Sequence, residues 1–140
     1  MRIEDLNSDL VEIAEKKMAL GRLSYSDRIY DALEEELHAL EDAFVEQHGP
    51  HLEAVLAKVH EKHCPETEVL SPLAYLAKTY LKVGTQADGT AVYDIPDFQQ
   101  GIVIDSDHYS DAHLVLVPNP VRILLTAPQE NIREEVWPTP

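Results

Sequence analysis

The residues best suited to chemistry lie together in "HGPHLEAVLAKVHEKHC", residues 48–64, which holds four of the seven histidines and the only cysteine. Imidazole and thiolate bind transition metals, and a Cys–His pair can also form a nucleophilic site. If the segment is helical, His51 lies about 13 Å from the histidines at its other end. Only the C-terminal group can therefore act as one site: His60, His63 and Cys64.

A metal site needs three or four ligands, so these residues would need help from elsewhere in the chain. The segment "DSDHYSDAH", residues 105–113, offers candidate ligands at Asp105, Asp107, His108 and His113. This segment lacks the spacing of a calcium-binding loop. We favour the simpler interpretation, in which the loop is a polar turn whose Asp and Ser side chains bond their own backbone.

Cys64 is interpreted in the same way, as a small filler beside an apolar stripe rather than a nucleophile. The chain has no phosphate-binding glycine loop, no G-x-S-x-G elbow and no H-E-x-x-H helix. We therefore assign no catalytic residues, favour a non-enzymatic role and expect no cofactor. A metal-binding protein or metal-dependent hydrolase, using His60, His63 and Cys64 with the 105–113 loop and a divalent transition metal, is the alternative.

The elements that must position these residues are helical in the first part of the chain. Apolar residues recur at 3-4-3 spacing from Ile3 to Ile13, and Gly21 ends this first helix. "HGP" at 48–50 should break or kink the chain before a further helix from Pro50 to His63. Between the first helix and the HGP segment lies a two-heptad apolar seam, formed by Tyr30, Leu33, Leu37, Leu40 and Phe44. The seam predicts either a helical hairpin or the interface of a homodimer.

Residues 71–84, "SPLAYLAKTYLKVG", fit two structures. Ser71 as a cap, Pro72 in the first turn and Gly84 at the end favour a helix, which is our prediction. The alternation of Thr79, Leu81 and Val83 with other side chains is typical of a strand, and "ADG" could turn it back into "TAVYDI".

From residue 90 the composition becomes typical of strands, with short aliphatic runs separated by Pro, Gly, Asp and Asn. "PNP" at 118–120 predicts a hairpin between the last two runs. The fold class predicted is α+β, with three to four N-terminal helices on one face of a three- to four-stranded antiparallel meander. One domain spans 1–140, with 1–84 mainly helical, 90–128 mainly strands and 129–140 an extended tail.

The charge is strongly acidic, with a net charge of -15 and 13 acids against 5 bases in residues 1–47. Such a surface repels phosphate backbones, which argues against a nucleic-acid partner. The longest aliphatic run, "LVLV" at 114–117, predicts no membrane span, and the absence of an export signal and of a second cysteine favours the cytoplasm. The best-supported function is a small acidic protein-binding or regulatory module whose acidic helical half contacts a protein partner, which a basic surface would suit.

Overall fold

The structure of the protein is a computed structural model that describes residues 2–138. Within this range two long helices precede six short strands. This order confirms the predicted α+β class, with helices N-terminal to antiparallel strands. The elements are α1 (Ile3–Gly21), α2 (Tyr30–His63), the 3-10 turn η1 (Pro72–Tyr75), β1 (Leu81–Thr85), β2 (Ala91–Asp94), β3 (Ile102–Ile104), β4 (Ala112–Val117), β5 (Arg122–Ala127), the 3-10 turn η2 (Pro128–Glu130) and β6 (Ile132–Trp137).

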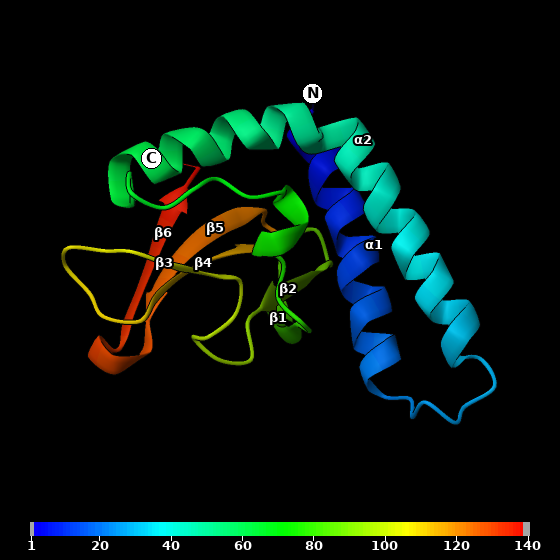
Figure 1. Ribbon diagram of the computed structural model, residues 1–140. Helices are drawn as coiled ribbons and strands as arrows, with labels where there is room; N and C mark the ends of the chain where they lie inside the picture. Colours follow the sequence, from blue (N-terminus) through cyan, green and yellow to red (C-terminus); the bar gives the residue numbers. More distant parts are fainter. Residues whose placement is uncertain (1, 139–140) are drawn as a thin grey trace.

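The second and third predicted helices are a single helix, α2, so the prediction of three to four helices is wrong. Pro50 lies inside α2 and cannot donate a hydrogen bond to the carbonyl of Glu46. The helix bends at this level instead of ending, so that its second half turns away from α1 and crosses over the sheet (Figure 1). Phe44 before the bend and Leu52 after it are buried in the same core, and this burial keeps the helix continuous.

The strands form two sheets rather than one meander. β3, β4, β5 and β6 make a four-stranded antiparallel sheet, and the predicted hairpin at 118–120 joins β4 to β5. β1 and β2 pair separately as a two-stranded hairpin. Two side chains from the β4–β5 hairpin bond to backbone carbonyls of β2. Asn119 Nδ2 donates to the carbonyl of Ala91 at 2.5 Å, and Arg122 donates to that of Tyr93 at 2.7 Å.

The helix predicted over residues 71–84 is wrong beyond its first turn. Pro72–Tyr75 form the turn η1, and Leu81–Thr85 form the strand β1. The buried hydroxyl of Tyr80 donates to the carbonyl of Leu116 at 2.8 Å and accepts the amide of Ala77 at 3.0 Å. The long-range bond to Leu116 fixes the chain in the extended form, which the alternation of residues 79–83 had offered as the alternative to a helix.

The predicted extended tail, residues 129–140, contains the turn η2 and the strand β6 within its described part. β6 pairs with β5 from Ala127 opposite Ile132 to Ile123 opposite Trp137. The three middle residues of β6, 133–135, are exposed, whereas Val136 is buried in the main core. The tail is therefore an edge strand of the sheet, and it lies close to the second half of α2 (Figure 1).

The four-stranded sheet is buried on both faces, since every residue of β4 and β5 is buried. Leu114 and Leu116 share a core with the buried residues of α2, which covers one face of the sheet as predicted. Val115 and Val117 point to the opposite face and pack with Tyr93 of the β1–β2 hairpin, which the sequence did not predict as a layer. The second half of α2 thus has the sheet beneath it, whereas the first half extends beyond the sheet and packs mainly against α1 (Figure 1).

Candidate functional site

The first half of α2, residues 30–47, contains seven acidic residues and no Lys or Arg. Four of these acids are exposed and have no ion-pair partner among residues 2–138. With 100° between successive residues, the four fall within about 60° of one another and extend about 22 Å along the helix. We call them the acidic stripe: Asp31, Glu35, Asp42 and Glu46.

The acidic stripe places like charges side by side. Asp31 with Glu35, and Asp42 with Glu46, are i,i+4 neighbours, and each such pair destabilises a helix by about 0.2–0.5 kcal/mol. Glu36, which is not in the stripe, instead pairs with a lysine of α1 at 2.7 Å. The acids on the outer side of the hairpin therefore repel one another, whereas Glu36, which faces α1, is paired with a base.

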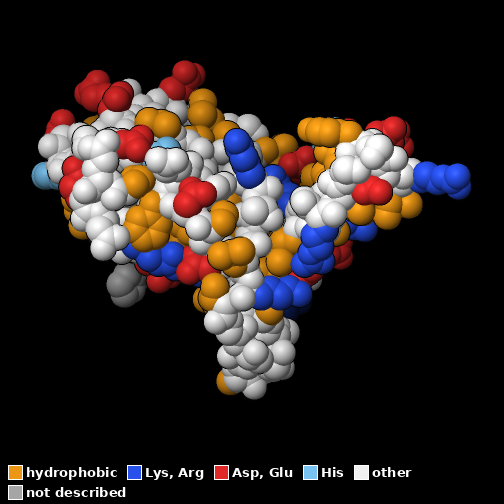
Figure 2. All heavy atoms as spheres, turned by 90° about the horizontal axis from the view of Figure 1, so that it is seen from below, with side chains coloured by type: hydrophobic (Ala, Val, Ile, Leu, Met, Phe, Trp, Pro, Cys, Tyr) orange, Lys and Arg blue, Asp and Glu red, His pale blue; other side chains and the backbone are white. Residues whose placement is uncertain are grey.

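The outer end of the helical hairpin exposes two large side chains. Tyr25 is 87% exposed and Ile29 is 60% exposed. The ring of Tyr25 lies against that of Tyr30, with 4.8 Å between centroids and a 54° tilt. Seen from below, the projecting hairpin carries hydrophobic and charged side chains together on its surface (Figure 2). Aromatic residues are enriched at protein interfaces, so the tip adds exposed aromatic and apolar area next to the acidic stripe.

The five predicted seam residues lie on the inner side of α2, facing α1. Leu37 and Phe44 are buried in a core that includes the apolar residues of α1, and Leu40 packs against it. Tyr30 and Leu33 are half-buried. Of the two structures that the seam allowed, the chain adopts the helical hairpin. A homodimer would therefore have to use another surface.

His48 joins the two helices at the bend. Its side chain is 1% exposed, and Nε2 lies 2.6 Å from a carboxylate oxygen of Asp9 on α1. The other ring nitrogen has no partner within residues 2–138. The pair fastens α2 to α1 just before Pro50. His48, the first residue of the HGP segment that was predicted to break the chain, therefore makes a structural contact.

His60, the central residue of the predicted metal site, is buried and fully hydrogen-bonded. Its Nδ1 lies 2.8 Å from the carbonyl of Thr67, which can only accept, so Nδ1 carries the proton. Nε2 then accepts the hydroxyl of Tyr75 at 2.7 Å, and this hydroxyl accepts the amide of Leu70 at 3.1 Å. Both ring nitrogens are therefore engaged, Nδ1 as a donor and Nε2 as an acceptor, and His60 connects α2 to the segment that follows it.

Cys64 is fully buried at the end of α2. Burial raises the pKa of its thiol, and a hydrogen bond with Thr67 opposes this only in part. The two nitrogens of His60 are bonded elsewhere, so this histidine does not act as a base for the thiol. A protonated, buried thiol without a paired imidazole packs as a small apolar group.

The remaining metal candidates are brought together only in part. His63, Asp107 and His108 line one pocket of about 380 Å³, together with Glu134 of β6. Burial lowers the pKa of His63, and the nearby charge of Glu134 partly offsets this. Across residues 2–138, however, no three His, Cys, Asp or Glu side chains are placed to hold one ion.

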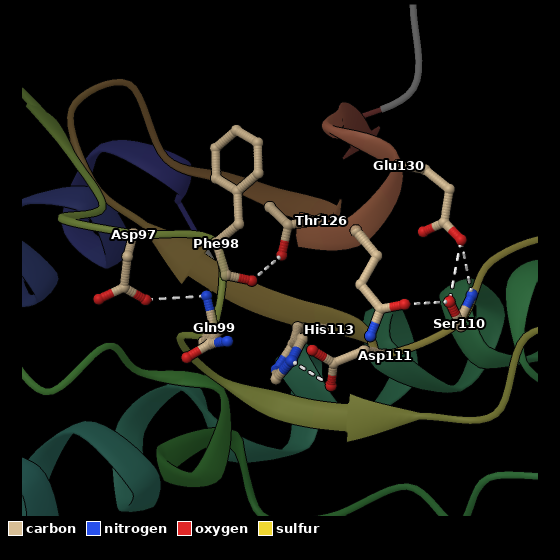
Figure 3. A network of polar contacts seen from close by, with 9 residues as sticks. Asp97, Phe98, Gln99, Ser110, Asp111, His113, Thr126 and Glu130 are labelled. Carbon is tan, nitrogen blue, oxygen red and sulfur yellow. Dashed lines mark hydrogen bonds and ion pairs between the residues drawn. The ribbon is translucent and has the colours of Figure 1, made fainter.

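Asp105 and His113 lie outside that pocket. The amide of Asp105 donates to the hydroxyl of Thr67 at 2.9 Å, which ties the loop to the end of α2. His113 is buried in β4, with Nε2 3.3 Å from Asp111 (Figure 3). The 105–113 segment also contains turn bonds of the expected kind, such as those from the amides of His108 and Tyr109 to the hydroxyl of Ser106.

The sequence predicted the acidic helical half as a contact surface, but it did not single out the four residues of the stripe as one set, or the exposed tip. The 4-7-4 spacing of the four acids places them on one face and could have revealed the stripe. The exposure of Tyr25 and Ile29 could not have been read in this way, because both lie before the helical periodicity begins.

Comparison with known proteins gave no match to a family model, a curated protein or a solved structure.

Proposed function

We propose that this protein is a non-enzymatic binding module that holds a basic protein partner on the outer side of its helical hairpin. The observation that carries the proposal is the acidic stripe, which contains two like-charge i,i+4 pairs and has no ion-pair partner among residues 2–138. Solubility alone would be served equally by acids spaced to avoid repulsion.

The shape of this surface supports the same role. The first half of α2 packs mainly against α1 and extends away from the sheet, so a partner could approach its outer side without displacing the core (Figure 1). The exposed side chains of Tyr25 and Ile29 supply apolar area next to the charge. Charge complementarity would govern the association rate, and the apolar tip would add affinity.

The proposal places the protein in a reducing compartment, the cytoplasm, where its single, buried cysteine would stay reduced. The same negative field would repel nucleic acid, which leaves basic proteins as the partners that it suits.

A photoreactive amino acid placed at Ile29 or at Asp42 would identify the partner. In living cells, both positions should cross-link to the same basic protein, whereas the same amino acid at Gln129, an exposed residue on η2, should not. The purified partner is then titrated by calorimetry at rising salt.

The decisive comparison uses two variants that remove the same amount of charge. Neutralising the stripe should weaken binding at least about tenfold, since four rim charges act together, and the variant is D31N/E35Q/D42N/E46Q. The control variant, E53Q/E66Q/E68Q/D107N, neutralises four exposed acids elsewhere and should change the affinity much less. Equal effects of the two variants, or binding that is insensitive to salt, would contradict the proposal.

The metal-dependent alternative retains one supporting observation, namely that His63, Asp107 and His108 line one pocket. Elemental analysis of protein purified without a histidine tag tests it. A transition metal present at well below one ion per chain would leave it without support.

A further inference from the structure

A groove of about 390 Å³ lies between the second half of α2 and the end of β6. Its apolar part is formed by Val55 and Val59 on the helix and by Val136 and Trp137 on the strand. This volume lies within the range of small-molecule sites, which are mostly apolar with a few polar groups that orient the ligand. The groove is therefore large enough and apolar enough to take the body of a small organic molecule.

The polar residues of the groove are all basic or imidazole side chains. Lys58, Lys62, His51 and His63 line it, and no Asp or Glu does. In a chain with 26 acids and 11 Lys and Arg residues, such a lining departs sharply from the average surface. Burial lowers the pKa of His63, which disfavours its charged form, so the positive charge of the groove is attributed to the two lysines.

The two lysines are not engaged elsewhere. Neither Lys58 nor Lys62 has an ion-pair partner within residues 2–138, whereas Lys16 and Lys82 are paired with glutamates at 2.7 and 2.9 Å. A positive charge near the C-terminus of a helix interacts favourably with the helix dipole, and this interaction accounts for Lys62 in the last turn. It does not account for Lys58, one turn earlier, or for the apolar floor beneath both.

Helix geometry arranges the charge along one side of the groove. His51, Lys58 and Lys62 fall within about 40° of one another on α2 and extend over about 16 Å, while Val59 is turned toward the strand. A ligand lying in the groove would meet apolar side chains below and positive charge along its edge. The complementary ligand has an apolar body and one negative charge.

We propose that this groove, hereafter the basic groove, binds a small amphipathic anion, an organic carboxylate with an aromatic or aliphatic body. The carboxylate pairs with Lys58 and Lys62, and the apolar body lies on Val55, Val59 and Trp137. This site is separate from the acidic stripe and does not depend on the protein-binding role.

Trp137 is the only tryptophan of the chain, so its fluorescence reports directly on the basic groove. The probes are phenylbutanoate, phenylbutanol and phenylbutylammonium, which share one apolar body and differ in charge. Phenylbutanoate should change the emission of Trp137 saturably at concentrations up to about 5 mM, the range expected for a ligand of this size. The alcohol should bind about fivefold more weakly, and the cation more weakly still.

Two lysine variants with equal charge change provide the control. K58M/K62M should weaken phenylbutanoate binding about fivefold or more and leave phenylbutanol binding unchanged. K17M/K78M, which removes two lysines from a different groove, should leave both unchanged. Circular dichroism verifies the fold, and K58Q/K62Q replaces the methionine pair if that variant aggregates.

Three results would overturn the proposal. These are the lack of a saturable response to phenylbutanoate, equal binding of the anion and the cation, and equal effects of the two lysine variants.

Discussion

The two halves of α2 belong to one helix but differ in almost every physical property. Residues 30–47 contain seven acids and no Lys or Arg. The buried hydrophobic residues of this half are Leu37 and Phe44. Residues 51–63 carry Lys58 and Lys62 and bury a stripe against the sheet. Continuous secondary structure therefore does not imply a common role, because each half is shaped by what it packs against.

The boundary between the halves lies at His48, Gly49 and Pro50. His48 holds the first half to Asp9 of α1, and Pro50 bends the helix toward the sheet. Gly49 is buried, and a Cβ at its position would lie 3.5 Å from Val45, an ordinary contact. The bend is thus a property of Pro50 rather than of crowding at Gly49.

The largest expected difference between the halves concerns packing. L56A should lower the free energy of unfolding by about 2–5 kcal/mol, because Leu56 is 2% exposed in the main core. L33A in the first half should lower it by about 1 kcal/mol or less, since Leu33 is only half-buried. Urea unfolding followed by circular dichroism measures both, and equal losses would contradict the division of the helix into scaffold and projecting arm.

A second, smaller effect should come from the hydrogen bonds that fasten the second half of α2. Y75F leaves the Nε2 of His60 and the amide of Leu70 without their partner, which should cost about 1–3 kcal/mol. Y25F at the exposed tip is the matched substitution and should change the unfolding free energy by less than about 0.5 kcal/mol. If Y75F is as harmless as Y25F in urea unfolding, the proposed fastening is wrong.

Neutralising the acidic stripe should act in the opposite direction. The variant D31N/E35Q/D42N/E46Q removes two repulsive i,i+4 pairs but also the favourable charge of Asp31 in the first turn of α2, so the unfolding free energy should rise by about 0.5 kcal/mol or less at low ionic strength. The gain should shrink as salt screens the repulsion in the natural protein. Thermal unfolding at two salt concentrations tests this, with E53Q/E66Q/E68Q/D107N as the control; a loss of stability would show that the stripe is structural.

The smallest expected effect is the pH dependence that His63 adds to the second half. Burial lowers its pKa, so the unfolded chain binds a proton more readily than the folded one as the pH falls through about 6.5. The free energy of unfolding should therefore decrease from about pH 7 to about pH 5, and H63Q should make this slope shallower. Urea unfolding at several pH values measures the slope, and an unchanged slope would contradict the assignment.

The parts of the fold that depend on local signals could be predicted from the sequence. The helix ending at Gly21 and the hairpin at 118–120 follow from periodicity and turn residues. The strand at Leu81–Thr85 could not be separated from a helix, because the bonds of Tyr80 that decide it reach Leu116, far along the chain. The continuity of α2 through Pro50 likewise depends on burial against distant residues.

The candidate sites show the same limit. Helical spacing predicted that His51 does not share a metal with the histidines at the end of the segment, but it could not reveal that His60 is hydrogen-bonded to Thr67 and Tyr75. The basic groove combines a helix with a strand more than seventy residues later, so no local pattern predicts it. Residues that lie on one element can be grouped from the sequence, and those that meet across elements cannot.

The first half of α2 is the surface that we propose holds a basic partner. An NMR titration of the ¹⁵N-labelled protein with a lysine-rich amphipathic peptide tests this proposal most directly. Salt-sensitive shifts should be concentrated at the tip and along the outer face of α2, from Tyr25 to Glu46, with little change in residues 51–63. Shifts spread evenly over the exposed acids of the loops and of β6, or centred on them, would contradict it.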